Sequence, residues 1–191
     1  MMSLLKLSAA ALIAASGISS LAFAQEYPTK PIRMIVPFAP GGGTDVVARV
    51  LAQKMTEIFK QQVIVDNRAG GGGQMGVETA VHATPDGYTV IIMSGSYATN
   101  AAMFKLNFDP ANDILPMGLI GDTAFILVMH PGVGLKSVAE LVSHLKAKPG
   151  SLNYASSGTG GIAHLSGELF DLLAGTKMTH IAYKGTGPAM N

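Results

Sequence analysis

The fold of this chain is decided by the stretch IRMIVPFAPGGGTD, residues 32–45. The run Ile32–Val36 predicts a buried strand, and the proline and glycine residues after it break the strand pattern. Thr44 or Asp45 is suited to be the N-cap of a helix. We expect that helix to run to about Lys60, because apolar residues recur at three- and four-residue spacing: Val47, Val50, Leu51, Met55 and Ile58.

The order of strand, glycine loop and helix then repeats. A second unit has a strand at Val63–Val65, a loop at Gly70–Gly73 and a short helix at Gly76–Ala83. A third unit has a strand at Tyr88–Met93 and a short helical piece near Asn100–Phe104. Strands that alternate with helices at this spacing predict the α/β class, with a parallel sheet and right-handed crossovers.

A second α/β domain is expected beyond residues 107–121, where Pro, Asn, Asp and Gly replace the periodic pattern. An apolar strand is predicted at 125–129, and Ser137 with Glu140 forms a capping box at the start of a helix that ends near Lys148. A strand at 152–155, a helix that ends at Gly175 and a strand at 179–183 follow. That helix is expected to face a core through its leucines: Leu165, Leu169, Leu172 and Leu173.

We place the first domain at residues 25–121 and the second at 122–191, and we expect the second to be incomplete in this chain. Only two of its strands are clear, and a layered domain normally needs more strands to bury its faces. The sequence reaches Asn191 in what has the pattern of the start of another helix. We interpret the chain as the N-terminal part of a longer protein.

Residues 1–24 have the pattern of a secretory signal peptide. Lys6 supplies the positive charge, Leu7–Ile18 is apolar, and Ala22-Phe23-Ala24 presents small residues where a signal peptidase cuts. The apolar run is shorter than the roughly 20 residues that a membrane-spanning helix needs. We therefore predict cleavage after Ala24 and a soluble mature protein in the periplasm, with a retained membrane anchor as the alternative.

The composition excludes several kinds of protein. The chain has no cysteine, so it contains no disulfide, no thiolate metal site and no lipoprotein anchor. Its formal net charge is +1, without the basic stripe that nucleic-acid binding requires. Hydrophobic residues make up 48% of the sequence, which is enough for a core without cross-links. We expect no nucleic-acid partner.

Many of the 23 glycines cluster at three places, in loops that follow predicted strands. In an open parallel sheet, ligands bind beyond the carboxyl ends of the strands, where helices begin. Glycine lets the backbone approach a ligand, and the N-terminus of a helix offers unpaired N–H groups to an anion. Two such loops from different domains favour an anion site. For any single loop, the alternative is that the glycines only make a tight turn.

Nucleotide binding and catalysis are the rival interpretations. Gly71–Gly76 matches G-x-G-x-x-G and Gly158–Ala163 matches its G/A form, but neither of the next strands ends in the acidic residue that would hold a ribose. The sequence has no P-loop, G-x-S-x-G or H-E-x-x-H motif. His164 and Glu168 are four apart on one helix face, which favours an orienting hydrogen bond over a metal site. The other histidines are interpreted as surface or boundary residues: His82, His130, His144 and His180.

Several short motifs occur along the chain in a fixed order: YPTKPI from Tyr27, VPFAPGG from Val36 with Asp45, Asn67-Arg68, Asp86-Gly87-Tyr88, Pro149-Gly150, YASSG from Tyr154 with His164-Leu165, and Tyr183-Lys184-Gly185. In their order and spacing, these motifs resemble the Bug-type receptors of tripartite tricarboxylate transporters. The resemblance covers everything after the signal peptide. Ala69, where the family has Pro, and Gly161, where it commonly has Ser, are departures from the pattern.

The resemblance implies a two-domain, type II periplasmic-binding-protein-like fold that closes over a carboxylate. The loop at Phe38–Gly42 is implied to meet the ligand through backbone groups and waters, and the loop at Ser156–Gly161 to hold a carboxylate at a helix start. Asp45 is expected to cap a helix beside the site. The expected ligand-binding residues are Phe38, Ala39, Pro40, Gly41, Gly42, Ser94, Ser156, Ser157, Gly158, Thr159, Gly160, His164, Tyr183 and Lys184.

The sequence therefore predicts a solute receptor without a reaction, a cofactor or a metal ion of its own. Its expected partners are a small carboxylate and the membrane permease of the same transporter, and it is expected to be a monomer when complete. Its two domains would pivot about residues 118–129. An enzyme or nucleotide-binding protein that uses the glycine loops is the second hypothesis. A regulator's effector domain is the third, and the export signal speaks against it.

Overall fold

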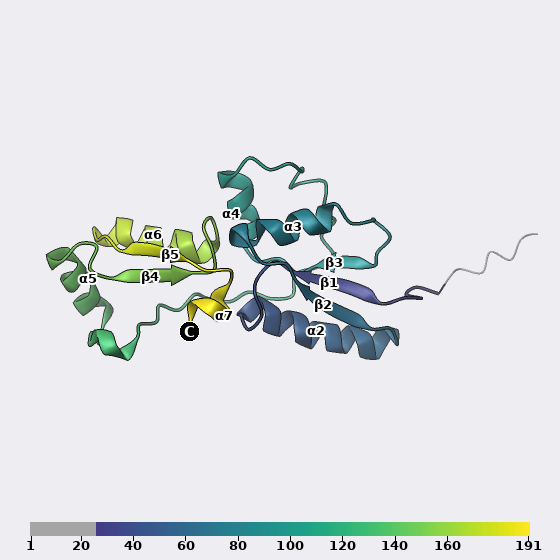
Figure 1. Ribbon diagram of the computed structural model, residues 1–191, viewed down its shortest axis with the longest axis horizontal. Coiled ribbons are helices and arrows are strands. Elements are labelled where there is room, and N and C mark those ends of the chain that lie inside the picture. The colour runs from purple at the N-terminus through teal and green to yellow at the C-terminus, as the bar shows by residue number, and fades with distance from the viewer. Residues whose placement is uncertain (1–25) are drawn as a thin grey trace, which may run out of the picture.

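A computed structural model describes residues 26–191 of the chain. The predicted signal peptide and its cleavage site lie outside these residues and stay a prediction. Within residues 26–191, no helix has the length and the apolar character needed to span a membrane. The described strands form two separate parallel sheets, which lie at opposite ends of the molecule (Figure 1).

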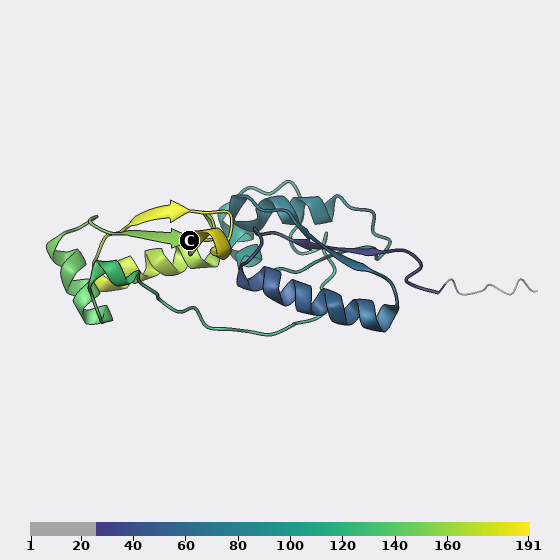
Figure 2. The same ribbon diagram turned by 60° about the horizontal axis from the view of Figure 1, so that its bottom comes forward.

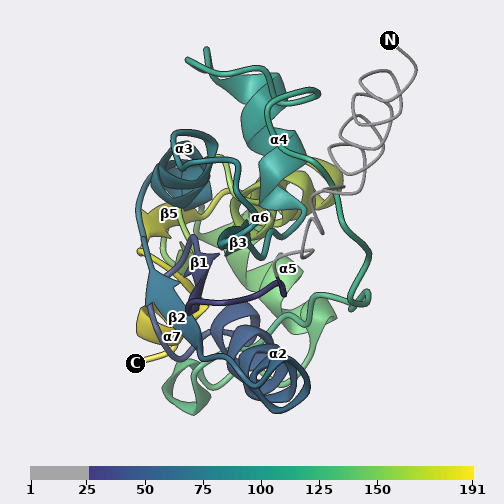
Figure 3. The same cartoon turned by 90° about the vertical axis from the view of Figure 1, so that its right-hand side faces the viewer.

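The first sheet has the strand order β2-β1-β3, with β1 at Ile32–Val36, β2 at Val63–Asn67 and β3 at Thr89–Ile91. Both neighbours run parallel to β1, as the alternating pattern predicted, and Met34 aligns with Val65 on one side and Val90 on the other. Helix α2 (Gly43–Phe59) covers one face of the sheet and α3 (Gln74–Val81) covers the other (Figure 3). We call this unit, with the 3₁₀ turn η1 (Gly71–Gly73) and helix α4 (Ser96–Met103), the first lobe.

The core of the first lobe explains why Ile32–Val36 is apolar throughout. As the central strand, β1 is covered on both faces, which is typical of parallel sheets. Its buried side chains pack with Ala48 and Ala52 of α2, and small residues there let the helix lie close to the sheet. Lys60 ends α2 in the left-handed conformation with φ 55°, close to the predicted end.

The second sheet consists of β4 (Asn153–Ser156) and β5 (Thr179–Ala182), which pair in parallel. We call this unit, with helices α5 (Val138–Ala147) and α6 (Ile162–Ala174), the second lobe. The turn η2 (Pro131–Val133) precedes it and the short helix α7 (Thr186–Ala189) follows β5. The predicted capping residue Ser137 accepts a hydrogen bond from Glu140 N–H at 3.2 Å, and Gly175 ends α6 in the left-handed conformation.

The strand predicted at 125–129 is not present. This segment lies in the long irregular connection between α4 and η2, which runs below the two lobes in Figure 2. The side chains of residues 125–128 are exposed, with Ile126 at 82%, and Met129 is half-buried. Apolar β-branched composition favours a strand, but a strand also needs a neighbour that satisfies its N–H and C=O groups. Within residues 26–191, no strand pairs with this segment.

The prediction that α6 faces a core through its leucines is wrong for Leu169, Leu172 and Leu173, whereas Leu165 is half-buried. Leu172 and Leu173 are 77% and 79% exposed, and no residue of α6 is fully buried. The helix contacts β4 and β5 on one side, and within residues 26–191 no element covers its leucine side. The second lobe's buried apolar residues lie instead on α5, at Leu141 and Leu145.

Candidate functional site

The loops that follow the strands of both sheets meet where the two lobes touch. β1 and β4 approach this junction from opposite directions, so that the carboxyl ends of both sheets face each other (Figure 1). In the first lobe the loops at 37–42, 68–73 and 94–95 reach the junction, and in the second lobe those at 157–161 and 183–185 do. The sheets therefore bring together the glycine loops that the sequence singled out.

The closest approach joins the η1 loop to the loop before α6. A Cβ atom built on Gly158 would lie 2.8 Å from the Cα of Gly72, and one built on Gly72 would collide with the carbonyl oxygen of Thr159. Gly72 also has φ +62°, a conformation that other residues adopt at a cost. Glycine at these positions is thus required for the two backbones to touch.

Side chains of helix α4 bind the loop before α6. Ser96 Oγ accepts a hydrogen bond from Ile162 N–H at 3.1 Å, and Thr99 Oγ1 donates to the carbonyl of Gly160 at 2.8 Å. Asn100 Nδ2 donates to the carbonyl of Gly72 at 3.1 Å, within the first lobe. These three side chains lie on the face of α4 that meets the second lobe, and they link both glycine loops.

A second contact joins the Phe38–Gly42 loop to the start of α7. Ala39 N–H donates to the carbonyl of Lys184 at 2.8 Å. A Cβ atom on Gly42 would lie 2.6 Å from Thr186 Oγ1, so a larger residue at position 42 would displace the Thr186 hydroxyl. The side chain of Lys184 is exposed, and only its backbone takes part.

Asp45 does not cap α2 as predicted, because the N-cap is Gly42 and no side chain bonds to it. Asp45 lies in the first turn and reaches back, where its carboxylate accepts from Gly41 N–H at 3.0 Å. Asn67 Nδ2 donates a hydrogen bond to the Asp45 carboxylate at 2.9 Å and another to the carbonyl of Phe38 at 3.0 Å. The Arg49 guanidinium and these hydrogen bonds lower the pKa of Asp45 to about 2, against the cost of its burial. The network fixes the shape of the 38–42 loop.

Two histidines support the loop of the second lobe. His164 Nδ1 accepts a hydrogen bond from Gly160 N–H at 3.3 Å, and His180 Nε2 shares one with Ser156 Oγ at 2.7 Å. Their ring centroids are 4.1 Å apart. Burial lowers the pKa of His180, which favours the neutral form. His180 lies at the boundary, as predicted, but its bond to Ser156 places it at the loop, which its position in the sequence did not indicate.

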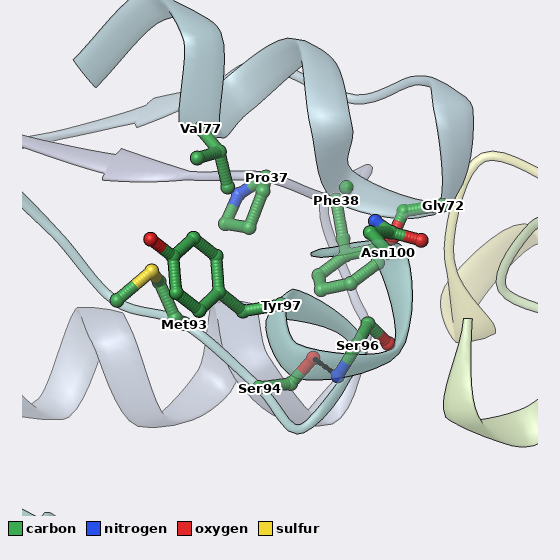
Figure 4. Close-up of a pocket in the computed structure, with 10 residues that line it drawn as sticks. Pro37, Phe38, Gly72, Val77, Met93, Ser94, Ser96, Tyr97 and Asn100 are labelled. Atoms are coloured by element: carbon green, nitrogen blue, oxygen red, sulfur yellow. Dashed lines mark hydrogen bonds between the residues drawn. The ribbon is translucent and has the colours of Figure 1, made fainter. Parts of the chain in front are cut away.

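The junction is closed in this structure. The cavity that remains beside it has a volume of ≈ 10 Å³, room for about one water molecule. Phe38, Gly72, Ser94 and Asn100 are among the residues that line it (Figure 4). This cavity is too small for a carboxylate of several atoms.

Most of the residues predicted for the site come together at this junction. The loops at Phe38–Gly42 and Ser156–Gly160 and the side chain of His164 lie there, and Ser94 lines the small cavity. Tyr183 contributes its backbone, because its N–H donates to the carbonyl of Ser156 at 3.0 Å while its side chain is exposed. Sequence reasoning missed the side chains on α4, because it placed that helix near Asn100–Phe104 and left Ser96 in the loop.

We predict that Asp45→Asn lowers the free energy of unfolding by about 1–2 kcal/mol at pH 7. Because the pKa of Asp45 is lowered from 3.8 to about 2, its stabilisation is present above pH 4 and is lost as the pH falls toward 2. Urea denaturation of wild type and variant at several pH values should therefore give curves that converge near pH 2. Asp122→Asn, at an exposed carboxylate, is the control. A constant difference from pH 7 to pH 2 would contradict this role of Asp45.

We also predict that Gly72→Ala separates the lobes. The added Cβ collides with Thr159, so the loop must retreat and the hydrogen bonds from α4 to residues 160 and 162 break. Small-angle scattering should show a larger radius of gyration than for wild type. Gly43→Ala is the matched control, because a Cβ there meets no atom within 4 Å. If Gly72→Ala and Gly43→Ala scatter identically, the contact of Gly72 with the loop at Thr159 does not hold the lobes together.

Comparison with known proteins places the sequence of this chain in a family. Residues 47–191 match the family described as tripartite tricarboxylate transporter family receptor. Protein BugT of Bordetella pertussis is 40% identical over 181 residues, which cover 93% of this chain and 56% of BugT. The chain thus spans about half the length of the relatives that it matches.

Solved structures agree with that result. A structure of an R. palustris protein with adipate has a TM-score of 0.82 at 35% identity, over 86% of this chain and 56% of that one. MatC from Rhodopseudomonas palustris with bound malate has a TM-score of 0.80 at 31% identity, with the same coverage. The described fold is that of these solute receptors, and this chain belongs to the receptor family of the tripartite tricarboxylate transporters.

Proposed function

We propose that this protein binds a small carboxylate between its two lobes and delivers it to the membrane permease of a tripartite tricarboxylate transporter. The proposal includes export to the periplasm with removal of residues 1–24. It also includes a monomeric complete protein that needs no cofactor or metal ion. Relatives with adipate and with malate support a carboxylate as the ligand class.

The observation that carries the proposal is the N-terminus of α6 at the junction of the lobes. The first N–H groups of a helix have no acceptor within the helix, and the helix dipole favours an anion there. Ile162 N–H donates across the junction to Ser96, and within residues 26–191 the N–H groups of Ala163 and His164 have no acceptor. A carboxylate would take these donors when the lobes open and close around it.

Ligand affinity would come from enclosure more than from any single loop. A helix terminus contributes about 0.3–1 kcal/mol, and up to about 2 in a partly buried site. Micromolar binding needs about 8.2 kcal/mol. The difference has to come from hydrogen bonds that both lobes make once water is excluded. Two lobes that meet through backbone groups are suited to supply them.

Ser156 and His180 are the arrangement closest to catalytic machinery, because a hydroxyl and an imidazole share a hydrogen bond. However, Ser156 is only 2% exposed, and its oxygen also accepts from Gly158 N–H at 3.1 Å. A nucleophile has to reach its substrate, whereas this hydroxyl holds a turn. The pair therefore favours a role in shaping the binding loop over acyl transfer.

A thermal-shift screen of mono-, di- and tricarboxylates, amino acids and nucleotides tests the proposed function. A ligand at a hundredfold excess over its dissociation constant stabilises the folded state by about 2.7 kcal/mol, so a true ligand raises the melting temperature measurably. We expect one or more carboxylates to do so and nucleotides to have no effect. Stabilisation by nucleotides, with none by any carboxylate, would contradict the proposal and favour the nucleotide-binding alternative.

A further inference from the structure

The side-chain oxygen of Asn100 is buried at the junction of the lobes without a hydrogen-bond donor. Asn100 is 4% exposed, and within residues 26–191 its Oδ1 has no hydrogen-bond partner. The orientation of the amide is fixed by its other end, because Nδ2 donates to the carbonyl of Gly72. Turning the amide over would place two oxygens against each other. The unsatisfied group is thus the oxygen, an acceptor.

This acceptor faces the second lobe. A Cβ atom built on Gly160 would lie 2.8 Å from Asn100 Oδ1, so the backbone of the α6 loop lies directly against it. Figure 4 shows the oxygen on the side of Asn100 that points toward the yellow-green ribbon of the C-terminal part of the chain. A buried acceptor without a donor is unfavourable, and most such groups in proteins are satisfied.

The anion site proposed at the start of α6 lies close to the Asn100 acceptor. Ser96 is one helical turn before Asn100, and its hydroxyl accepts from Ile162 N–H at the start of α6. Side chains one turn apart have Cβ atoms about 5–6 Å from each other, so a ligand of a few atoms can reach both places. A carboxylate that took the donors of α6 would have its adjoining carbon near Asn100.

We propose that Asn100 is a specificity-determining residue of this site, whose side-chain oxygen accepts a hydrogen bond from a hydroxyl or ammonium group next to the carboxylate of the ligand. The inference rests on the proposed function and deepens it. It assigns the ligand to the carboxylates that carry such a donor. When the lobes open, the loop at Gly160 leaves Asn100, and a donor-bearing ligand satisfies the oxygen on closure. A carboxylate without the donor leaves it unsatisfied.

Pairs of acids that differ by one hydroxyl test this inference. Isothermal titration calorimetry is carried out with lactate and propionate, malate and succinate, and citrate and tricarballylate. For each pair that binds, we expect the hydroxy acid to bind wild type at least tenfold more tightly, because an unpaired buried acceptor costs about that factor or more. Equal affinities within the pairs would show that a water molecule satisfies Asn100 and would overturn the inference.

Two variants separate specificity from structural support. Asn100→Ala removes the acceptor, and we expect the affinity ratio within a pair to fall to about one. Thr99→Val is the control, because it removes the hydrogen bond to Gly160 but keeps the acceptor. We expect Thr99→Val to lower the affinity for both acids of a pair equally and to preserve their affinity ratio. A ratio unchanged in Asn100→Ala would contradict the inference, and the wild-type ratios decide it even if this variant fails to fold.

These experiments distinguish a failure of the proposed receptor function from a failure of the role assigned to Asn100. If no acid of any pair binds and the carboxylate screen is negative, the proposed function is wrong, and this inference fails with it. If acids bind but the hydroxyl makes no difference, the receptor function stands and the role of Asn100 is wrong.

Discussion

The backbone contact between Gly72 and Gly158 is the constraint on which the junction depends. Two loops from different sheets touch without side chains between them, and a single methyl group at either position would force them apart. This contact brings the start of α6 against α4, so that the N–H of Ile162 in one lobe meets the hydroxyl of Ser96 in the other. Glycine is therefore required here for close approach as much as for conformational freedom.

The closed junction makes some hydrogen bonds between the lobes and leaves one buried acceptor unpaired, and a ligand can change the sum of these two effects. Ser96 and Thr99 hold the α6 loop through hydrogen bonds of the kind that contribute about 0.5–1.5 kcal/mol each, whereas closure buries the oxygen of Asn100 without a donor. A ligand that replaced the first interactions and also satisfied the last would add one hydrogen bond that the closed junction lacks. Asp45, Asn67, His164 and His180 keep the loops in shape while this exchange occurs.

Local sequence signals predicted most of the fold. Strands such as Ile32–Val36 and helix ends such as Gly175 depend on periodicity and on cap residues, which are read over a few positions. The failures depend on partners far along the chain: residues 125–129 have the composition of a strand but no described neighbour, and Leu172 has no described cover. At the site, the glycine loops were predictable because glycine clusters are local. Ser96, Asn100 and His180 were not, because only the folded chain brings them to loops 24 to 66 residues away.

Amide chemical-shift mapping tests the central claim, that the ligand binds where the glycine loops of the two lobes meet. The ¹⁵N-labelled protein is titrated with the tightest carboxylate of the screen. The account predicts that the largest shifts fall on residues 160–164 and on Gly72, with only small changes in the open groove of ≈ 460 Å³ between α2 and β2, which Gln53, Thr56 and Gln62 help to line. Shifts confined to that groove, with unchanged amides at 160–164, would contradict it.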